Sequence, residues 1–247
     1  MPTINPGVTI NPGITLTASK LPPPVSAGLQ LYLDAGNANS YTGSGSTWSD
    51  MVNAIDFTLY GDTTPAYSSN NGGYITFDPS SSQYAQGASL PSALTTWTVE
   101  AWIQHNATNM TSGSPCIVTE VYAGNPINFT LGNTSDSFPN VQTGFFNGGW
   151  ASTLIGTTLT SGNWYHIVGT WDGTTVTLYL NGNLAASDNT WIGNPAARGG
   201  QGIRLMSRWD VSHLWGGNLA IVRIYDNDIT AAGVVQNFNA ERARFGL

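Results

Sequence analysis

The feature that most constrains the fold of this chain is a period-two alternation of apolar and polar residues. It is clearest in HIVGTWDGTTVTLYLNG, residues 166–182, where Val176, Leu178 and Leu180 occupy every second position. Successive side chains of a strand point to opposite faces, so this alternation predicts a strand with one buried face. A chain built from such segments must cover its apolar faces by pairing sheets.

Turn signals bound this predicted strand on both sides. Asp172-Gly173 predicts a two-residue type I′ turn, because that turn needs positive φ at both central positions, and Asn181-Gly182 predicts the next turn. Further short runs of β-type residues are separated by turn clusters: LQLYLDAG, GYITFDP, TWTVEAWIQ, PCIVTEVY, INFTLG, GIRLMS and LAIVRIYDN. Strands at this spacing predict an all-β antiparallel sandwich or jelly roll.

The end of the chain, DITAAGVVQNFNAERARFGL, departs from the β pattern. Val234, Phe238 and Phe245 lie at helical spacing, and Thr230 is a candidate N-cap. Gly233 weakens a helix at this place. We therefore expect a short C-terminal helix that packs on the sandwich.

Residues 1–18 show a different pattern, in which the hexapeptide TINPGV is followed by TINPGI. The alternation predicts an extended N-terminal arm with one apolar face, and the prolines argue against a central strand. A disordered tail is the alternative. The apolar face of the arm comprises Ile4, Pro6, Val8, Ile10, Pro12, Ile14 and Leu16.

The proline-rich stretch SKLPPPVSAG, residues 19–28, follows the arm and predicts a stiff linker. We expect the folded domain to begin near Leu29 and to span residues 29–247. A chain of this length can form one sandwich domain.

Composition excludes several functions. Charged residues make up 9% of the chain and the net charge is −7, with a single lysine, Lys20, so a nucleic-acid site is not expected. The single Cys116 excludes an internal disulfide and is expected to be buried. No apolar run approaches the length of a membrane span, and we expect no classical export signal.

The order of these segments resembles a known superfamily. TWTVEAWIQ, then NWYHIVGTWDGTTVTLYLNGNLAAS and GGNLAIVRIYDNDITAAGVVQNF, resemble the laminin-G-like or concanavalin A-like jelly-roll superfamily over about residues 28–247. The resemblance implies an antiparallel jelly roll, in which Trp48, Trp97, Trp102, Trp164 and Trp171 occupy core positions. The opening LDAGN, the ending NFNAERARFGL and the arm are also similar to structural proteins of tailed bacteriophages.

Some members of this superfamily are glycosidases, but the expected carboxylate pair is missing. Retaining glycosidases place two carboxylates about 5–5.5 Å apart. Here Glu100 is followed at the same parity by Trp102 and Gln104, and Glu120 has no acidic partner either. His166 fits the hairpin pattern and is expected to be packed or hydrogen-bonded in a strand. We therefore expect a protein that is not an enzyme.

Tryptophans outside the core positions are candidates for sugar binding, because aromatic rings with a few polar groups commonly hold sugars. The alternative is that they fill the core or a subunit interface, where aromatic residues are also enriched. The candidate glycan-binding residues are Trp150, Trp191, Trp209, Asp210 and Trp215.

We expect no cofactor and assign no metal site. Several laminin-G-like domains hold calcium, but the aspartates here are isolated, and an aspartate in a turn commonly bonds the backbone. The scattered aspartates are Asp34, Asp62, Asp78, Asp136 and Asp210.

Three functional hypotheses follow from the sequence. The first is a virion structural protein, a capsid decoration or fibre-type subunit, made in the host cytoplasm and displayed on the virion surface. Its arm would contact copies of itself and neighbouring virion proteins through strand addition. The second is a lectin-like adhesion module that binds host or environmental glycans. The third, a glycoside hydrolase, lacks paired carboxylates.

Overall fold

The alternating runs form the strands of two antiparallel sheets, as the sequence predicts. The structure is a computed structural model. It describes residues 22–92, 94–106, 111, 113–121, 127–133, 140–147, 149–154, 159–190, 195 and 202–247. The predicted arm, residues 1–18, lies outside the described residues.

Sheet A is eight-stranded in the described part of the chain. Its path is β14 (Asn183–Asp188), β13 (Val176–Leu180), β12 (Trp164–Trp171), β7 (Trp97–His105), β16 (Gly217–Tyr225), β5 (Tyr74–Phe77) and β4 (Ala66–Ser68), with β1 (Leu29–Asp34) paired to β16.

Sheet B also has eight strands among the described residues. Its order is β11 (Trp150–Leu154), β10 (Val141–Phe146), β9 (Ile127–Asn133), β8 (Cys116–Glu120), β15 (Ile203–Leu205), β6 (Tyr84–Gly87), β3 (Phe57–Tyr60) and β2 (Thr47–Trp48). Short 3₁₀ turns, η1 (Asn70–Gly72), η2 (Pro79–Ser81) and η3 (Arg242–Phe245), complete the described elements.

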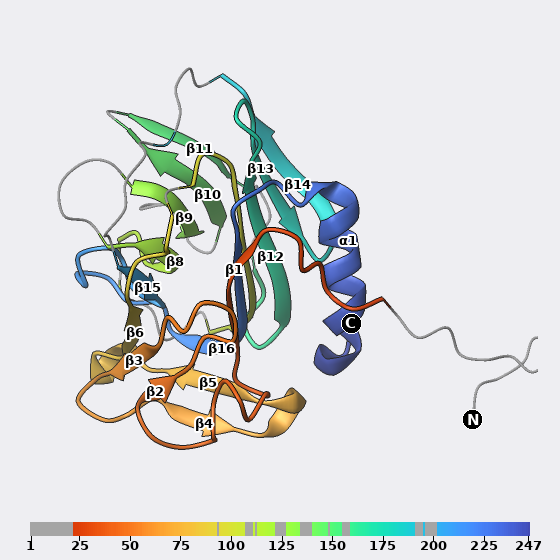
Figure 1. Cartoon of the computed structure of the whole chain (residues 1–247). Helices are drawn as coiled ribbons and strands as arrows, with labels where there is room; N and C mark the ends of the chain where they lie inside the picture. The colour runs from red at the N-terminus through yellow and green to blue at the C-terminus, as the bar shows by residue number, and fades with distance from the viewer. Residues whose placement is uncertain are drawn as a thin grey trace, which may run out of the picture.

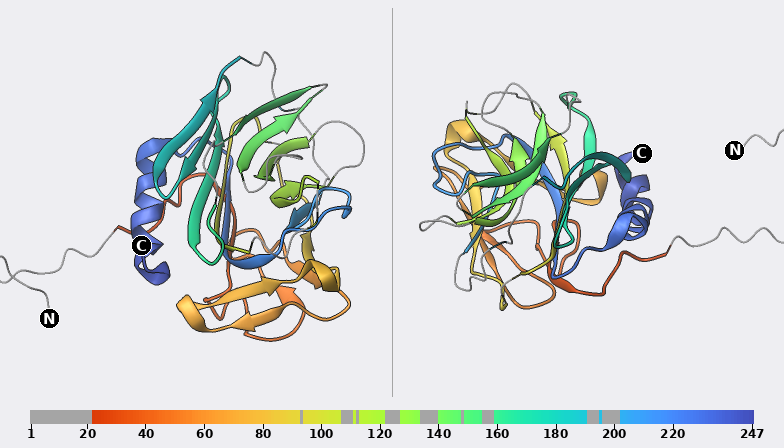
Figure 2. Two further views of the ribbon diagram at one scale, coloured as in Figure 1. Left: turned by 180° about the vertical axis from the view of Figure 1, so that it is seen from behind. Right: turned by 90° about the horizontal axis from the view of Figure 1, so that it is seen from above.

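The C-terminal helix α1 (Thr230–Glu241) packs on the outer face of sheet A, on the side away from sheet B (Figures 1 and 2). Trp102 of β7 stacks on Phe238 at a centroid distance of 5.8 Å and on Phe245 at 4.3 Å. Thr230 is the first residue of the helix rather than its cap, which is Ile229. The Asp228 side chain accepts the Thr230 backbone N–H at 2.9 Å.

Strand β7 is buried on both faces because it lies between two layers. Val99 and Ile103 pack into the core shared with sheet B, whereas Trp102 packs under the helical segment. The five tryptophans predicted for the core, Trp48, Trp97, Trp102, Trp164 and Trp171, are all buried. Cys116 is buried as well, as expected.

The two predicted turns have different outcomes. Asn181 and Gly182 both have positive φ and join β13 to β14 in a two-residue turn, as predicted. The Asp172-Gly173 prediction is wrong in length, since the hairpin loop spans residues 172–175. There the Asp172 carboxylate accepts the backbone N–H groups of Thr174 and Thr175, and only the glycine has positive φ.

The end of the proline-rich linker is docked rather than free. Gln236 of α1 donates to the Pro23 carbonyl at 2.7 Å, and the Val25 backbone N–H donates to Asn237 at 2.7 Å. Leu29 begins β1, where the folded domain was expected to start. The chain therefore enters the sandwich beside α1, on the outer side of sheet A (Figure 1).

Candidate functional site

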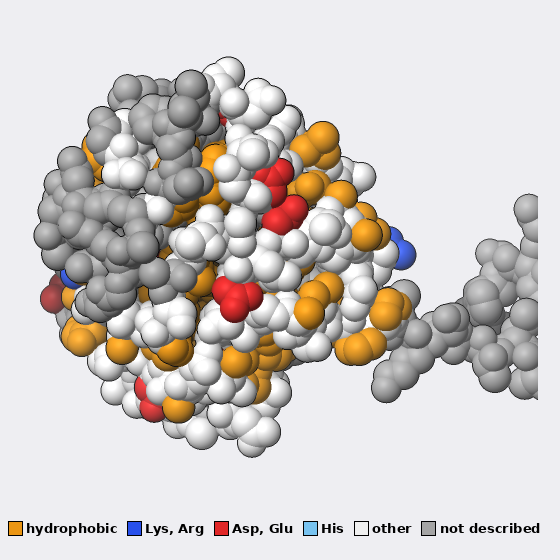
Figure 3. Space-filling model, turned by 45° about the horizontal axis from the view of Figure 1, so that its top comes forward, with side chains coloured by type: hydrophobic (Ala, Val, Ile, Leu, Met, Phe, Trp, Pro, Cys, Tyr) orange, Lys and Arg blue, Asp and Glu red, His pale blue; other side chains and the backbone are white. Residues whose placement is uncertain are grey.

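The outer face of sheet B carries polar and aromatic side chains, whereas α1 covers part of the outer face of sheet A. Alternation decides which residues point outward. In β3 Phe57 and Leu59 are buried, while Thr58 and Tyr60 are exposed. In β6 and β15 the same alternation leaves Tyr84, Gln86 and Arg204 half-buried on this face. Charged side chains are few on the described surface in the space-filling view (Figure 3).

Strand register brings these outward residues side by side. Tyr60 lies opposite Tyr84 in the β3–β6 ladder, and Arg204 lies opposite Gln86 in the β15–β6 ladder. The rings of Tyr60 and Tyr84 stack with centroids 4.9 Å apart and an interplanar angle of 14°. The guanidinium of Arg204 lies 5.8 Å from the Tyr84 centroid, within the range of a cation–π contact.

Arg204 is held in place by hydrogen bonds on two of its nitrogens. Nε donates to Gln86 Oε1 at 2.9 Å, and Nη1 donates to the carbonyl oxygen of Trp209. Burial lowers the pKa of Arg204, but an arginine keeps its proton at neutral pH. The result is a positioned cation between a tyrosine pair and a tryptophan-bearing loop.

The loop that follows β15 supplies Trp209 and Asp210. The guanidinium of Arg208 lies 4.3 Å from the centroid of the Trp209 ring. Asp210 accepts hydrogen bonds from the backbone N–H and the hydroxyl of Ser212, at 3.1 and 2.6 Å, and this bonding lowers its pKa against the opposing effect of burial. We call the surface formed by Tyr60, Tyr84, Gln86, Arg204 and Trp209 the aromatic face.

The structure separates the predicted glycan-binding residues. Trp209 is half-buried and Asp210 is exposed in the loop beside the aromatic face. Trp215 is fully buried in the core, with its ring 5.9 Å from that of His105, so a contact of this indole with a glycan is ruled out. Trp191 lies outside the described residues, and for Trp150 only the backbone, at the start of β11, is described.

Tyr60, Tyr84 and Arg204 were not among the sequence-based candidates. The alternation within FTLY and YAQG indicates outward positions for both tyrosines. It does not show that β3, β6 and β15 are neighbours, which follows from the sheet order.

Glu100 belongs to a buried ion-pair network under α1. Its Oε1 accepts from Arg223 at 2.7 Å and lies 3.2 Å from His166 Nε2, and its Oε2 accepts from Asn237 at 2.5 Å. Burial by itself raises the pKa of Glu100, but the charge of Arg223, the interaction with His166 and the hydrogen bond from Asn237 hold it at about 2. His166 is thus a packed strand histidine, as expected.

Glu120 is on the other sheet and is also buried. Its Oε2 accepts the backbone N–H of Asn128 at 2.8 Å. Among the described residues no three His, Cys, Asp or Glu side chains gather as metal ligands would. Of the predicted turn aspartates, Asp78 accepts the Ser80 N–H and Asp34 forms an ion pair with Arg244 at 2.9 Å, whereas Asp136 lies outside the described residues.

Comparison with known proteins identifies a matching family and several solved structures with a similar fold. The sequence profile of the Concanavalin A-like lectin/glucanases superfamily matches residues 69–235. No curated protein matches the chain at a significant level. In the described part of the chain, no helix is long and apolar enough to cross a membrane.

Solved structures at low sequence identity share the fold. Domain 4 of AbnA, a GH43 extracellular arabinanase from Geobacillus stearothermophilus, in complex with arabinotriose, is 16% identical with a TM-score of 0.64, covering 85% of this chain and 98% of that one. Trypanosoma rangeli sialidase is 14% identical with a TM-score of 0.60, covering 89% and 34%. The ligand binding domain of botulinum neurotoxin serotype D, in complex with N-acetylneuraminic acid, is 12% identical with a TM-score of 0.61, covering 87% and 51%.

Proposed function

We propose that this chain, which belongs to the Concanavalin A-like lectin/glucanases superfamily, is a non-enzymatic carbohydrate-binding protein that holds glycans on its aromatic face. The observation that carries this proposal is the stacked pair of Tyr60 and Tyr84 rings beside Arg204 on the outer surface of sheet B, with the backbone carbonyl of Trp209 bonded to Arg204.

The chemistry of the aromatic face suits a sugar. A sugar ring offers an apolar C–H surface that packs on an aromatic ring, while its hydroxyls need donors and acceptors. Tyr60 is 42% exposed and supplies ring area. Gln86 and Arg204 supply hydrogen-bonding groups already fixed by their mutual contact at 2.9 Å, so little side-chain freedom is lost on binding.

Two of the similar folds support this class of ligand. The arabinanase domain was solved with arabinotriose and the neurotoxin domain with N-acetylneuraminic acid. Both ligands are carbohydrates, and one of them is acidic, which suits a face that includes a positioned arginine.

The surroundings of the two strand glutamates support binding without catalysis. Glu100 faces α1 and has its charge balanced by Arg223, while Glu120 is buried in sheet B with Asn128. A glycosidase needs a carboxylate pair that flanks one substrate bond. Our proposal predicts that the protein releases no reducing sugar from any glycan that it binds. The Glu100→Gln variant is expected to release none either.

A glycan array tests the proposed binding. The intact protein is expected to bind at least one glycan class, and Tyr60→Ala and Trp209→Ala are expected to weaken that binding. Leu184→Ala is the matched control, because Leu184 is a 64% exposed apolar side chain on β14 of sheet A. Absence of binding by the intact protein, or equal binding by all four proteins, would contradict the proposal.

We propose, as a second role, a virion structural subunit, with which the entry of the chain into the sandwich beside α1 is compatible. The contacts of Pro23 and Val25 with α1 fix the start of the described chain on the outer side of sheet A. An arm extending from there could pair with neighbouring subunits of a phage capsid or fibre, while the aromatic face of sheet B points away from the attachment. This arrangement would display the glycan-binding face outward on the virion surface.

Binding to particles tests the structural role separately. We expect phage particles that lack the protein to take up the full-length chain, and residues 22–247 to remain unbound although folded. If the truncated protein attaches as well as the full-length chain, the arm does not mediate assembly.

A further inference from the structure

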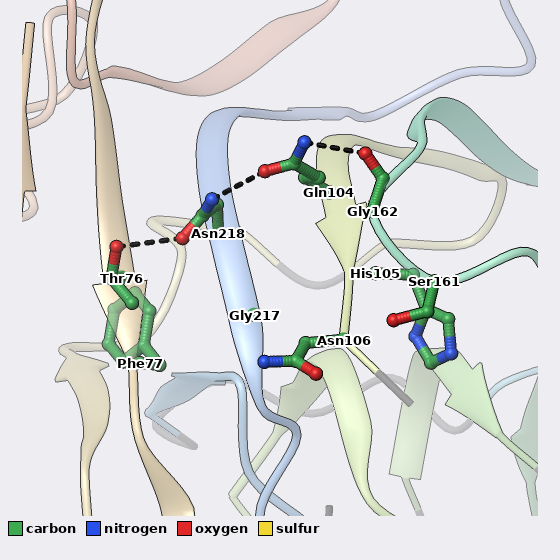
Figure 4. A pocket seen from close by; sticks show the side chains of 9 residues that line it. All are labelled: Thr76, Phe77, Gln104, His105, Asn106, Ser161, Gly162, Gly217 and Asn218. Carbon is green, nitrogen blue, oxygen red and sulfur yellow. Dashed lines mark hydrogen bonds between the residues drawn. The ribbon is translucent and has the colours of Figure 1, made fainter. Parts of the chain in front are cut away.

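A cavity of about 290 Å³ lies on the outer face of sheet A, next to the part covered by the C-terminal segment. Trp102 of β7 is covered by Phe238 and Phe245, whereas Gln104, two residues further along the same face, lines the cavity. Strands β5, β7 and β16 form one wall, and the loop with Ser161 and Gly162 forms another (Figure 4).

A continuous row of hydrogen bonds runs along one side of this cavity. The Thr76 hydroxyl donates to Asn218 Oδ1 at 2.7 Å, and Asn218 Nδ2 donates to Gln104 Oε1 at 2.7 Å. Gln104 Nε2 then donates to the Gly162 carbonyl at 2.6 Å (Figure 4). The row exists because Asn218 is paired with Thr76 on one side and with Gln104 on the other.

The row fixes both amides and leaves hydrogen-bonding capacity for a ligand. Each amide nitrogen has a second hydrogen, and each amide oxygen has a second lone pair. Asn106 and Ser161 add polar groups on the opposite side of the cavity (Figure 4). Alternating donors and acceptors at fixed positions match neighbouring hydroxyl groups, because each hydroxyl both donates and accepts.

The cavity wall carries no formal charge at neutral pH. Its nine lining residues include no Lys, Arg, Asp or Glu, and burial lowers the pKa of His105 to about 4. A charged ligand would lose its hydration here without gaining a counter-charge. The volume is at the small end of ligand sites, which usually enclose about 300–1,000 Å³, so it fits one small molecule or one sugar ring.

Gly217 keeps the cavity free of a side chain. It lies between Phe77 and His105 in the sheet, and a Cβ at this position would be 2.5 Å from the Gln104 carbonyl oxygen. Its φ of +136° is also one that other residues rarely adopt. The close approach of the β7 backbone and the backbone conformation therefore both favour glycine at this place in the cavity wall.

We propose that this cavity is a second binding site, which takes a single uncharged sugar residue through the Thr76–Asn218–Gln104 row. It lies on the opposite sheet from the aromatic face, so the inference does not rest on the binding proposed there.

Calorimetric titration of the full-length protein with glucose, galactose, mannose and N-acetylglucosamine tests this site. At least one of these sugars is expected to bind in the millimolar range. Gln104→Met and Thr76→Val keep the shape of the side chains and remove hydrogen-bonding groups, so each is expected to weaken binding roughly three- to tenfold. Leu184→Ala is expected to leave it unchanged, and glucuronic acid is expected to bind more weakly than glucose.

The outcomes separate the two sites. Loss of sugar binding in Tyr60→Ala with full binding in Gln104→Met would overturn the second site and leave the aromatic face as the sugar site. Absence of heat with all four sugars would also overturn it. Urea unfolding of each variant checks the fold, and Thr76→Val provides the same test if Gln104→Met is unstable.

Discussion

At the scale of single residues, Glu100 connects sheet A to the C-terminal helix. Arg223 is fully buried, with its guanidinium 4.4 Å from the Tyr32 ring, and it bonds both Glu100 and Glu241 at 2.7 Å. Asn237 of α1 donates to the same Glu100 carboxylate. A buried ion pair adds little net stability compared with apolar residues of the same shape, but removing one partner leaves the other charge unpaired.

Glu100→Gln is therefore expected to lower the free energy of unfolding by about 3 kcal/mol at neutral pH, measured by urea denaturation. Glu241→Gln is the matched control, for which we expect a smaller loss of unfolding free energy. The Glu241 side chain is 16% exposed, and Arg223 still has its ion pair with Glu100 in this variant. Equal losses of unfolding free energy in the two variants would show that Glu100 is no more important to this network than Glu241.

The pH dependence of stability provides a second check on the same residue. The pKa of Glu100 is about 2 in the folded protein, below the ordinary value of 4.5. A depressed carboxyl pKa stabilises the fold above the unfolded value, and this contribution is lost as the pH falls toward the folded value. The wild-type and Glu100→Gln unfolding free energies should therefore converge between about pH 4.5 and pH 2. A constant difference over this range would contradict the assignment.

At the scale of elements, the β13–β14 turn lies under the helix. Asn181 Oδ1 accepts the His166 backbone N–H at 2.9 Å, which ties the turn to β12. A Cβ on Gly182 would lie 3.0 Å from Phe238 Cδ1, and the φ of this glycine is +78°. Backbone conformation and helix packing therefore both favour glycine here.

Gly182→Ala is expected to destabilise the protein by about 1–2 kcal/mol from the left-handed backbone alone, and further through the contact with Phe238. Gly173→Ala is the matched control, because Gly173 also has positive φ but its Cβ would come no closer than 3.9 Å to another side chain. Urea denaturation compares the two, and a loss in Gly173→Ala as large as in Gly182→Ala would show that the Phe238 contact is unimportant.

The strands and turns could be predicted from the sequence more fully than the aromatic face. The alternation around Val176 and the glycine turn at residues 181–182 are local signals, so the hairpin and the sandwich class follow from sequence. The loop at residues 172–175 differs from the prediction because side-chain hydrogen bonds of Asp172 stabilise a longer turn. The aromatic face combines three strands far apart in the sequence, and no local pattern shows that they pair.

At the scale of the whole molecule, α1 and the start of the described chain lie on the outer side of sheet A, whereas the aromatic face lies on the outer side of sheet B. The start of the described chain docks on α1 through Pro23 and Val25, and Tyr225 Oη also donates to the Val25 carbonyl at 3.2 Å. The aromatic face belongs to the other sheet. The proposed attachment through residues 1–18 and the proposed binding on the aromatic face are therefore compatible with each other.

Two truncations test where the folded unit begins. A protein of residues 22–247 is expected to unfold at the same urea concentration as the full chain. A protein of residues 27–247 loses the hydrogen bonds of Pro23 and Val25 and is expected to be less stable by about 1–2 kcal/mol. If the two truncated proteins unfold at the same urea concentration, the contacts of Pro23 and Val25 contribute nothing to the stability of the fold.

The central claim is that the outer face of sheet B binds carbohydrate. The most direct measurement is a residue-resolved NMR titration of the isotope-labelled protein with the strongest glycan from the array. Binding on the aromatic face predicts the largest saturable shifts at Tyr60, Tyr84, Arg204 and Trp209, with little change around Gly182. Saturable shifts confined to other surfaces, or no shifts at any glycan concentration, would contradict it.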